Sequence, residues 1–156
     1  MPMNRSELLR PSLTRATPAR APYSQQVHFL ASFFGGPFAA LALAAINGER
    51  LGRWRRDAPW VLLGLLVYLA LEVALLQTEA GRALLQQLDV WVGQGAHGLV
   101  VRVYALGCFV VFMLRHRREQ AACDLVGLTR PAGLGPGIGL ILGGFVLSYL
   151  LRTVLA

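Results

Sequence analysis

The strongest constraint on this 156-residue chain is a set of long apolar runs separated by short polar segments. The runs cover residues 27–46, 59–77, 96–114 and 134–154. Each has about the 20 residues that an α-helix needs to cross the hydrocarbon core of a bilayer. Because the runs are apolar on nearly every helical face, they lack the polar stripe of a helix on a soluble core. The pattern therefore predicts an all-α integral membrane protein, a bundle of four transmembrane helices.

The segment before the first run has a different composition. Residues 1–26 are rich in Arg, Ser, Thr and Pro, and such a segment cannot bury enough apolar surface to fold. We expect a disordered, Arg-rich tail here, followed by a four-helix transmembrane domain over 27–156. No small-residue cleavage site follows the first run before the arginines, so the run is expected to stay in the mature protein.

The segment between the second and third runs is amphipathic. On a helix, its apolar side chains share one face and its polar side chains the other: Leu84, Leu88, Trp91 and Val92 against Gln86, Gln87 and Asp89. This pattern is typical of a helix that lies in the plane of the membrane interface. We predict a short interfacial helix between the second and third spans.

All fifteen basic residues are arginines, which excludes a catalytic lysine. A formal net charge of +7 raises the question of nucleic acid, but no recognition motif accompanies the arginines. They flank the apolar runs instead, where basic residues fix membrane orientation. The expected partners are therefore a lipid bilayer with anionic headgroups, and no nucleic acid.

The arginines also predict an orientation. They are abundant in the first and third loops, whereas the second loop holds only Arg82. The positive-inside bias then places loops 1 and 3 in the cytoplasm and the protein in a bacterial inner (plasma) membrane. Four full spans would leave the tail arginines outside, against the bias. A re-entrant hairpin at 35–37 would return the tail to the cytoplasm, but broken backbone at membrane depth needs cover from protein. We therefore expect a continuous first span.

A resemblance appears at the first run, in the segment 23–53. The segment is similar to the opening of small, uncharacterised multi-pass inner-membrane proteins of proteobacteria, which share a Phe-x-Gly-Gly-Pro-x-Ala pattern. The residues that carry the resemblance are Tyr23, Ser24, Phe34, Gly35, Gly36, Pro37, Ala39, Asn47, Leu51 and Gly52. It covers about a fifth of the chain. The resemblance implies a membrane protein and no particular activity.

Candidate catalytic and metal-binding residues are few. Cys108 and Cys123 are expected to be free thiols, and the three histidines have no metal-ligand spacing. We predict that His116 contacts lipid headgroups. No Ser or Cys lies in a recognisable nucleophile motif. The sequence therefore predicts no enzyme activity, no metal and no cofactor.

The glycines of the last run recur at helical spacing. Gly135, Gly139 and Gly143 fall on one face, where they would let a second helix approach closely. The segment lacks the Lys-Ser or Lys-Thr ending of a phosphate-binding loop. We predict a helix-packing face, within the chain or between copies. Gly35 and Gly36 are expected to form a similar packing notch.

Two charged residues lie well inside the spans. Glu72 and Arg102 fall at matching depths on consecutive antiparallel helices. An unpaired charge near the bilayer centre costs roughly 3 kcal/mol, so the match predicts an intramembrane ion pair. Tyr68, His97 and Arg152 are possible polar neighbours.

These features favour a non-enzymatic interaction or accessory-subunit role in a bacterial inner membrane. The partner would be a second copy of the chain, in a homo-oligomer, or a larger membrane protein. The alternative is a small transporter or channel component that uses the Glu72/Arg102 site.

Overall fold

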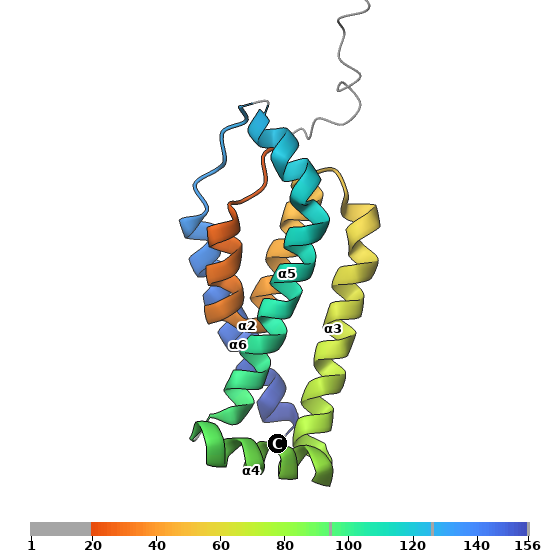
Figure 1. Ribbon diagram of the computed structural model, residues 1–156, viewed down its shortest axis with the longest axis vertical. Helices are drawn as coiled ribbons and strands as arrows, with labels where there is room; N and C mark the ends of the chain where they lie inside the picture. The colour runs from red at the N-terminus through yellow and green to blue at the C-terminus, as the bar shows by residue number, and fades with distance from the viewer. Residues whose placement is uncertain (1–19, 94, 126, 156) are drawn as a thin grey trace, which may run out of the picture.

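The computed structural model describes residues 20–93, 95–125 and 127–155 (Figure 1). The regular structure of these residues is all helical. The helices keep the labels of Figure 1, which begin at α2: α2 Gln25–Arg50, α3 Trp54–Gln77, α4 Glu79–Val92, α5 Ala96–Leu125 and α6 Leu134–Leu155. All but α4 are long and apolar enough to cross a membrane. The prediction of an all-α protein is confirmed, and four helices have the length and composition of a membrane span when α2 is counted as one segment across its kink.

Three helices set the long axis of the molecule. Helices α3, α5 and α6 run along this axis in alternating directions (Figure 1). Helix α4 lies across one end, joining α3 to α5, and we call this end the loop 2 end. The opposite end, where α2 joins α3 and α5 joins α6, is the loop 1 end. The last turn of α6 lies at the loop 2 end.

Helix α2 is a hairpin of two arms. Gly36 has φ 72° and ψ −163°, far from helical values. His28 Nε2 lies 3.2 Å from the carbonyl oxygen of Ala40, although the residues are 12 apart in sequence. In a straight helix that separation would be about 18 Å. The chain therefore reverses at Gly36, and both open ends of the hairpin lie at the loop 1 end (Figure 1).

Polar contacts close the open end of the hairpin. The backbone N–H of Tyr23 donates to Asn47 Oδ1 at 2.8 Å. Arg50 Nε donates to the carbonyl oxygen of Ala21 at 2.7 Å, and the Arg50 guanidinium lies 4.9 Å from the centre of the Tyr23 ring. The start of α2 is thus fixed to its end, which a continuous helix would not allow.

The Gly-Gly-Pro sequence explains the turn. The backbone region of Gly36 is one that glycine alone adopts readily. Pro37 follows at the start of the second arm, where its missing N–H removes no helical hydrogen bond. The expected continuous first span is therefore not formed, and the chain takes the alternative hairpin.

Other helices supply the cover that the hairpin needs. Its most extensive contacts are with α6 and α5. A Cβ placed on Gly144 of α6 would collide with the carbonyl oxygen of Gly35, so the two backbones touch. Added Cβ atoms on Gly133 and Gly137 would meet the side chain of Val27. Small residues thus let the first arm lie directly on α6.

The helices extend beyond the predicted spans at the loop 1 end. Helix α3 begins five residues before the predicted start at 59, and α5 continues eleven residues past the predicted end at 114. Gln25 Nε2 donates to Gln120 Oε1 at 2.7 Å, which fixes the α5 extension to the hairpin. Of the predicted tail, residues 1–19 lie outside the described residues.

Candidate functional site: two buried carboxylate clusters

Two carboxylates are fully buried in the bundle, one toward each end. We call Arg53, Asp57, Arg115, His116 and Glu119 the Asp57 cluster, and Tyr68, Glu72 and His97 the Glu72 cluster. Asp57 and Glu72 are both 0% exposed. One oxygen of each carboxylate lies 2.8 Å from the Nε2 atom of a histidine, at hydrogen-bond distance. A buried carboxylate must find such partners because its desolvation is costly.

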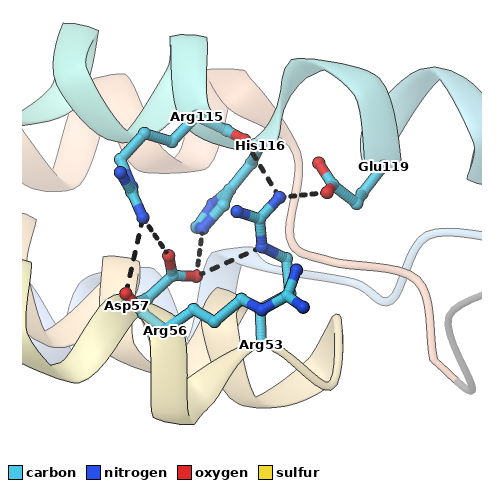
Figure 2. A network of polar contacts seen from close by, with 6 residues as sticks. All are labelled: Arg53, Arg56, Asp57, Arg115, His116 and Glu119. Atoms are coloured by element: carbon cyan, nitrogen blue, oxygen red, sulfur yellow. Dashed lines mark hydrogen bonds and ion pairs between the residues drawn. The ribbon is translucent and has the colours of Figure 1, made fainter.

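The Asp57 cluster joins the start of α3 to the far half of α5 (Figure 2). His116 Nε2 lies 2.8 Å from Asp57 Oδ2, and the His116 side chain is 1% exposed. Arg115 Nη2 donates to Asp57 Oδ1 at 3.2 Å. Arg53 Nε lies 3.9 Å from Asp57 Oδ2. One carboxylate therefore faces a histidine and two guanidinium groups.

The arginines of this cluster have further partners. Arg53 Nη1 donates to Glu119 and, at 3.3 Å, to the carbonyl oxygen of Arg115. The Arg115 guanidinium lies 4.7 Å from the centre of the Trp60 ring. Both cations are thus paired with acids and held by neighbouring groups. The arrangement fixes α3 against α5 and leaves neither arginine free for a ligand.

A close backbone contact makes room for Asp57. A Cβ on Gly48 of the second hairpin arm would lie 3.1 Å from Asp57 Oδ2. The glycine lets α2 approach the carboxylate directly. Three elements therefore meet at the Asp57 cluster: the hairpin, α3 and α5.

The Glu72 cluster lies toward the loop 2 end. Tyr68 Oη donates to Glu72 Oε1 at 2.8 Å from one turn earlier on α3. His97 Nε2, at the start of α5, lies 2.8 Å from Glu72 Oε2. Tyr68 is itself buried against Phe38 of the hairpin, with ring centres 5.2 Å apart. Because His97 is 18% exposed, the cluster leads from a buried carboxylate toward the surface.

The predicted Glu72–Arg102 ion pair is not formed. His97 and Tyr68, which the sequence offered only as possible neighbours, occupy the carboxylate. His97 and Arg102 are five positions apart, so they point in directions roughly 140° apart around α5. Arg102 lies over the Phe33 ring, 5.8 Å from its centre, on the hairpin side. His97, and not Arg102, faces the carboxylate from α5.

Arg102 lines a cavity of about 270 Å³ below the hairpin tip. The tip itself, at Gly35 and Gly36, forms part of the wall. Arg152 and Ser148 line the cavity from α6. Arg152 also lies within electrostatic reach of Glu72. The structure thus brings Arg102 and Arg152 to one cavity, next to the Glu72 cluster.

The predicted glycine face of α6 points away from the rest of the chain. Added Cβ atoms on Gly135, Gly139 and Gly143 would meet nothing within 4 Å among the described residues. The buried residues of α6 are instead Gly137 and Gly144, on the hairpin side. The packing within the chain therefore uses Gly137 and Gly144. The predicted row remains exposed.

The cysteines are free thiols. Cys108 is partly buried within α5, whereas Cys123, in the α5 extension, is 1% exposed. Burial, with a smaller effect of the Asp124 charge, raises the pKa of the Cys123 thiol. Cys123 is therefore a weak nucleophile at neutral pH. Among the described residues, no group of three His, Cys, Asp or Glu side chains is placed to hold a metal ion.

Sequence reasoning missed the Asp57 cluster. The segment around Asp57 was interpreted as an orientation signal, and His116 as a headgroup contact, but His116 is buried against Asp57. A signal was available. Asp57 lies two residues before the second apolar run, and His116 two residues after the third. On antiparallel helices these offsets place the two side chains at one depth.

Comparison with known proteins does not identify a relative. No family model matches the chain, and no curated protein or solved structure matches it significantly. The fold and the two clusters therefore define the protein only as an all-helical chain with four helices long and apolar enough to cross a membrane.

Proposed function

We propose that the protein is a multi-pass membrane protein of a bacterial inner membrane, with a non-enzymatic interaction role. Its partner is a second copy of the chain, and the contact is the outward face of α6. The observation that carries this proposal is the exposed row of Gly135, Gly139 and Gly143. The N-terminal resemblance to uncharacterised proteobacterial membrane proteins agrees with the proposal.

In this proposal α3, α5 and α6 cross the membrane and α2 enters it from the cytoplasmic side and returns. The orientation rests on arginine. The loop 1 end carries Arg20, Arg50, Arg53, Arg55, Arg56, Arg115, Arg117, Arg118 and Arg130, whereas the second loop carries Arg82. The positive-inside bias then makes the loop 1 end cytoplasmic. The hairpin returns the N-terminal tail to that side, which removes the conflict that four full spans would create.

Helix α4 fits the membrane interface on the opposite side. It lies across the end of the bundle (Figure 1), and Trp91 at its end is 87% exposed. Exposed Trp and Leu side chains on an amphipathic helix are typical of the headgroup region. We infer that α4 rests in that plane and links the two spans.

The glycine row supports the α6 contact because glycine lowers the stability of a helix unless the close approach that it allows is used. Glycine in a helix interior is about 1 kcal/mol less favourable than alanine, and here that cost recurs at three positions that contact nothing in the described chain. A second helix on this face would recover it, because glycine lets two backbones approach and gain dispersion contacts. Two identical rows are complementary in a twofold dimer.

The α6 contact can be tested by substitution. Gly139→Leu and Gly143→Leu should each shift the monomer–dimer equilibrium toward monomer by at least tenfold, because the side chain separates the helices. The measurement is energy transfer between differently labelled copies in liposomes, at several protein-to-lipid ratios. The matched control is Gly107→Leu, at an exposed helical glycine of α5 that lies outside the row.

Three outcomes decide the question. Dimerisation lost in both α6 variants and kept in the control supports the contact. Unchanged dimerisation in all variants would place the dimer contact elsewhere. A wild-type chain that stays monomeric at every ratio would exclude a second copy as the partner and leave a different membrane protein.

The orientation has its own test, with an introduced cysteine at an exposed position of the α5 extension. Arg117→Cys should react with a membrane-impermeant maleimide only in inverted vesicles, and a tag on the N-terminus should be digested from the same side. Cys108 and Cys123 should stay unlabelled at pH 7. Since burial raises the pKa of Cys123, its labelling should increase only at a more alkaline pH than that of an exposed cysteine. Labelling of Arg117→Cys in intact cells would reverse the proposed orientation.

A second candidate function is a small transporter or channel component. The Glu72 cluster favours it, because a buried carboxylate held by Tyr68 and a part-exposed His97 can exchange a proton at membrane depth. Proton flux in liposomes, measured with an entrapped pH dye under an imposed potential, tests this candidate. Flux that persists in Glu72→Gln, or no flux in the wild type, would exclude the cluster as a proton path.

A further inference from the structure

The cavity below the hairpin tip is lined by charged, polar and apolar side chains. Arg102 and Arg152 supply its charges, and Ser148 adds a hydroxyl group. Its aromatic lining residues are Phe33, Phe34, Phe145 and Tyr149. A ligand that fills this cavity must therefore combine an anionic group with apolar or weakly polar atoms.

The charges of the cavity are not balanced by protein. Neither arginine forms an ion pair or a side-chain hydrogen bond with another described residue. The nearby carboxylate is Glu72, and its two oxygens are taken by Tyr68 and His97. With Glu72 ionised, two guanidinium groups and one carboxylate leave a formal charge of +1. The helix dipoles at the tip do not favour either sign of ligand charge, because the C-terminal end of the first arm and the N-terminal end of the second arm meet there.

We propose that this cavity binds a singly charged phosphate-type oxyanion, held between Arg102 and Arg152. Guanidinium groups match the geometry and charge of phosphate oxygens better than any other side chain. A phosphodiester carries the single negative charge that the site lacks. The carbon atoms of the ligand next to its phosphate pack against the aromatic rings of the lining.

The depth of the arginines places the site near one membrane surface. Arg102 lies about 9 Å from the start of α5, and Arg152 about 5 Å from the end of α6, both at the loop 2 end. A lipid headgroup of that leaflet can reach this depth, and so can a small phosphate ester from the aqueous side. The headgroup source depends on the proposed membrane embedding, whereas the recognition chemistry does not. This site is separate from the proposed α6 contact.

The first experiment measures lipid retention. Purified protein is incorporated into nanodiscs of phosphatidylcholine with one tenth phosphatidylglycerol, extracted into a neutral detergent, and analysed by native mass spectrometry. We expect one phosphatidylglycerol per chain to survive extraction. Retention should fall at least tenfold in the double variant Arg102→Gln, Arg152→Gln and remain in Arg102→Lys, Arg152→Lys, which keeps the charge.

The second experiment uses a soluble anion. In neutral detergent, with lipid removed, glycerophosphoglycerol, a soluble phosphodiester with a single negative charge, should raise the melting temperature of the wild type in a saturable way, and sodium chloride at equal ionic strength should not. The matched control is Arg82→Gln, which removes an exposed arginine from the same end of the molecule outside the cavity. It should behave as the wild type does in both experiments.

The outcomes separate the two sources. Lipid retention without a response to glycerophosphoglycerol identifies a headgroup, and the reverse identifies a free phosphodiester. The absence of both in the wild type would overturn the proposal, and so would a response of Arg102→Gln, Arg152→Gln equal to that of the wild type. Because the wild type is measured directly, a variant that fails to fold does not decide the result.

Discussion

The Asp57 cluster and the Glu72 cluster contain the same pair of groups, a fully buried carboxylate and a histidine nitrogen at 2.8 Å. They differ in their arginines. In the Asp57 cluster, Arg53 and Arg115 are bound to acids and carbonyl oxygens within the cluster. Beside Glu72, Arg102 and Arg152 line a cavity and form no ion pair with a described residue. In our proposal, the binding site is the one whose cations have no protein partner, and a buried carboxylate alone does not mark a site.

The difference follows from geometry. Asp57 lies where α3 and α5 continue as paired extensions, so side chains from both helices reach it. Near Glu72, by contrast, the hairpin tip, α5 and α6 line a cavity. One end of the bundle therefore closes on itself, and the other keeps an opening.

The largest expected effect is at the closed end. Asp57→Ala should lower the stability of the protein by about 3–5 kcal/mol, because it leaves the buried His116 and the guanidinium of Arg115 without their carboxylate partner. Thermal unfolding in a single detergent measures the loss. Glu49→Ala, which removes an exposed acid on the same side, is the control and should change stability by less than about 0.5 kcal/mol. An equal effect of the two variants would mean that the Asp57 cluster does not hold the bundle.

The second-largest expected loss of stability is at the hairpin tip, which forms part of the cavity wall. Gly36→Ala should cost about 1–3 kcal/mol, because alanine is strained in the backbone region that Gly36 occupies. Gly107→Ala, at a helical glycine with open space around it, should be neutral or stabilising. The same thermal assay compares them. If Gly36→Ala is as stable as Gly107→Ala, the chain does not reverse at this residue.

Pairwise coupling distinguishes the partner of Glu72. Glu72→Gln and His97→Gln should be non-additive by about 0.5–3 kcal/mol, because the side chains are in contact. Glu72→Gln and Arg102→Gln should add to within about 0.5 kcal/mol, because no contact joins them. Two double-mutant cycles of thermal unfolding give both values. A larger coupling with Arg102 than with His97 would restore the ion pair expected from the sequence.

The smallest expected effect is at the open end. Arg102→Gln should change stability by less than about 0.5 kcal/mol in lipid-free detergent, since the exposed side chain has no ion-pair partner in the described chain. Arg115→Gln, on the same helix, should cost about 1–3 kcal/mol, because Asp57 loses a charged hydrogen bond. Equal effects of these two substitutions would remove the distinction between the clusters.

Much of the fold could be predicted from the sequence. Apolar runs of about 20 residues determine helix formation locally, and the long helices follow from them. The hairpin could not be predicted in this way. Gly36 and Pro37 are tolerated inside a spanning helix and also suit a tight turn, so their presence does not separate the two structures. The choice depends on contacts with α5 and α6, which are distant in sequence.

The site was predictable only in part. Charges inside an apolar run drew attention to Glu72 and Arg102, because such groups need a partner or water, and the structure buries Glu72 and places Arg102 in the lining of a cavity. Which residue of α5 contacts Glu72 depends on the orientation of α5 about its own axis. A helix that is apolar on every face has no sequence periodicity from which this orientation could be inferred. The Asp57 cluster was missed for a different reason. The extensions of α3 and α5 are rich in charged and polar residues, and hydropathy no longer indicates there that a helix continues.

The hairpin also has a consequence for the order of synthesis. Among the described helices, its two arms emerge from the ribosome first, and α6, which touches the Gly35 carbonyl, emerges last. Until then Val27 and Ala39, both buried in the finished bundle, lack the contact with α6. The first helices made are thus among the last to reach their final position. A chain that stops before Leu134 should leave the hairpin open to protease, and protection should appear only once α6 is complete.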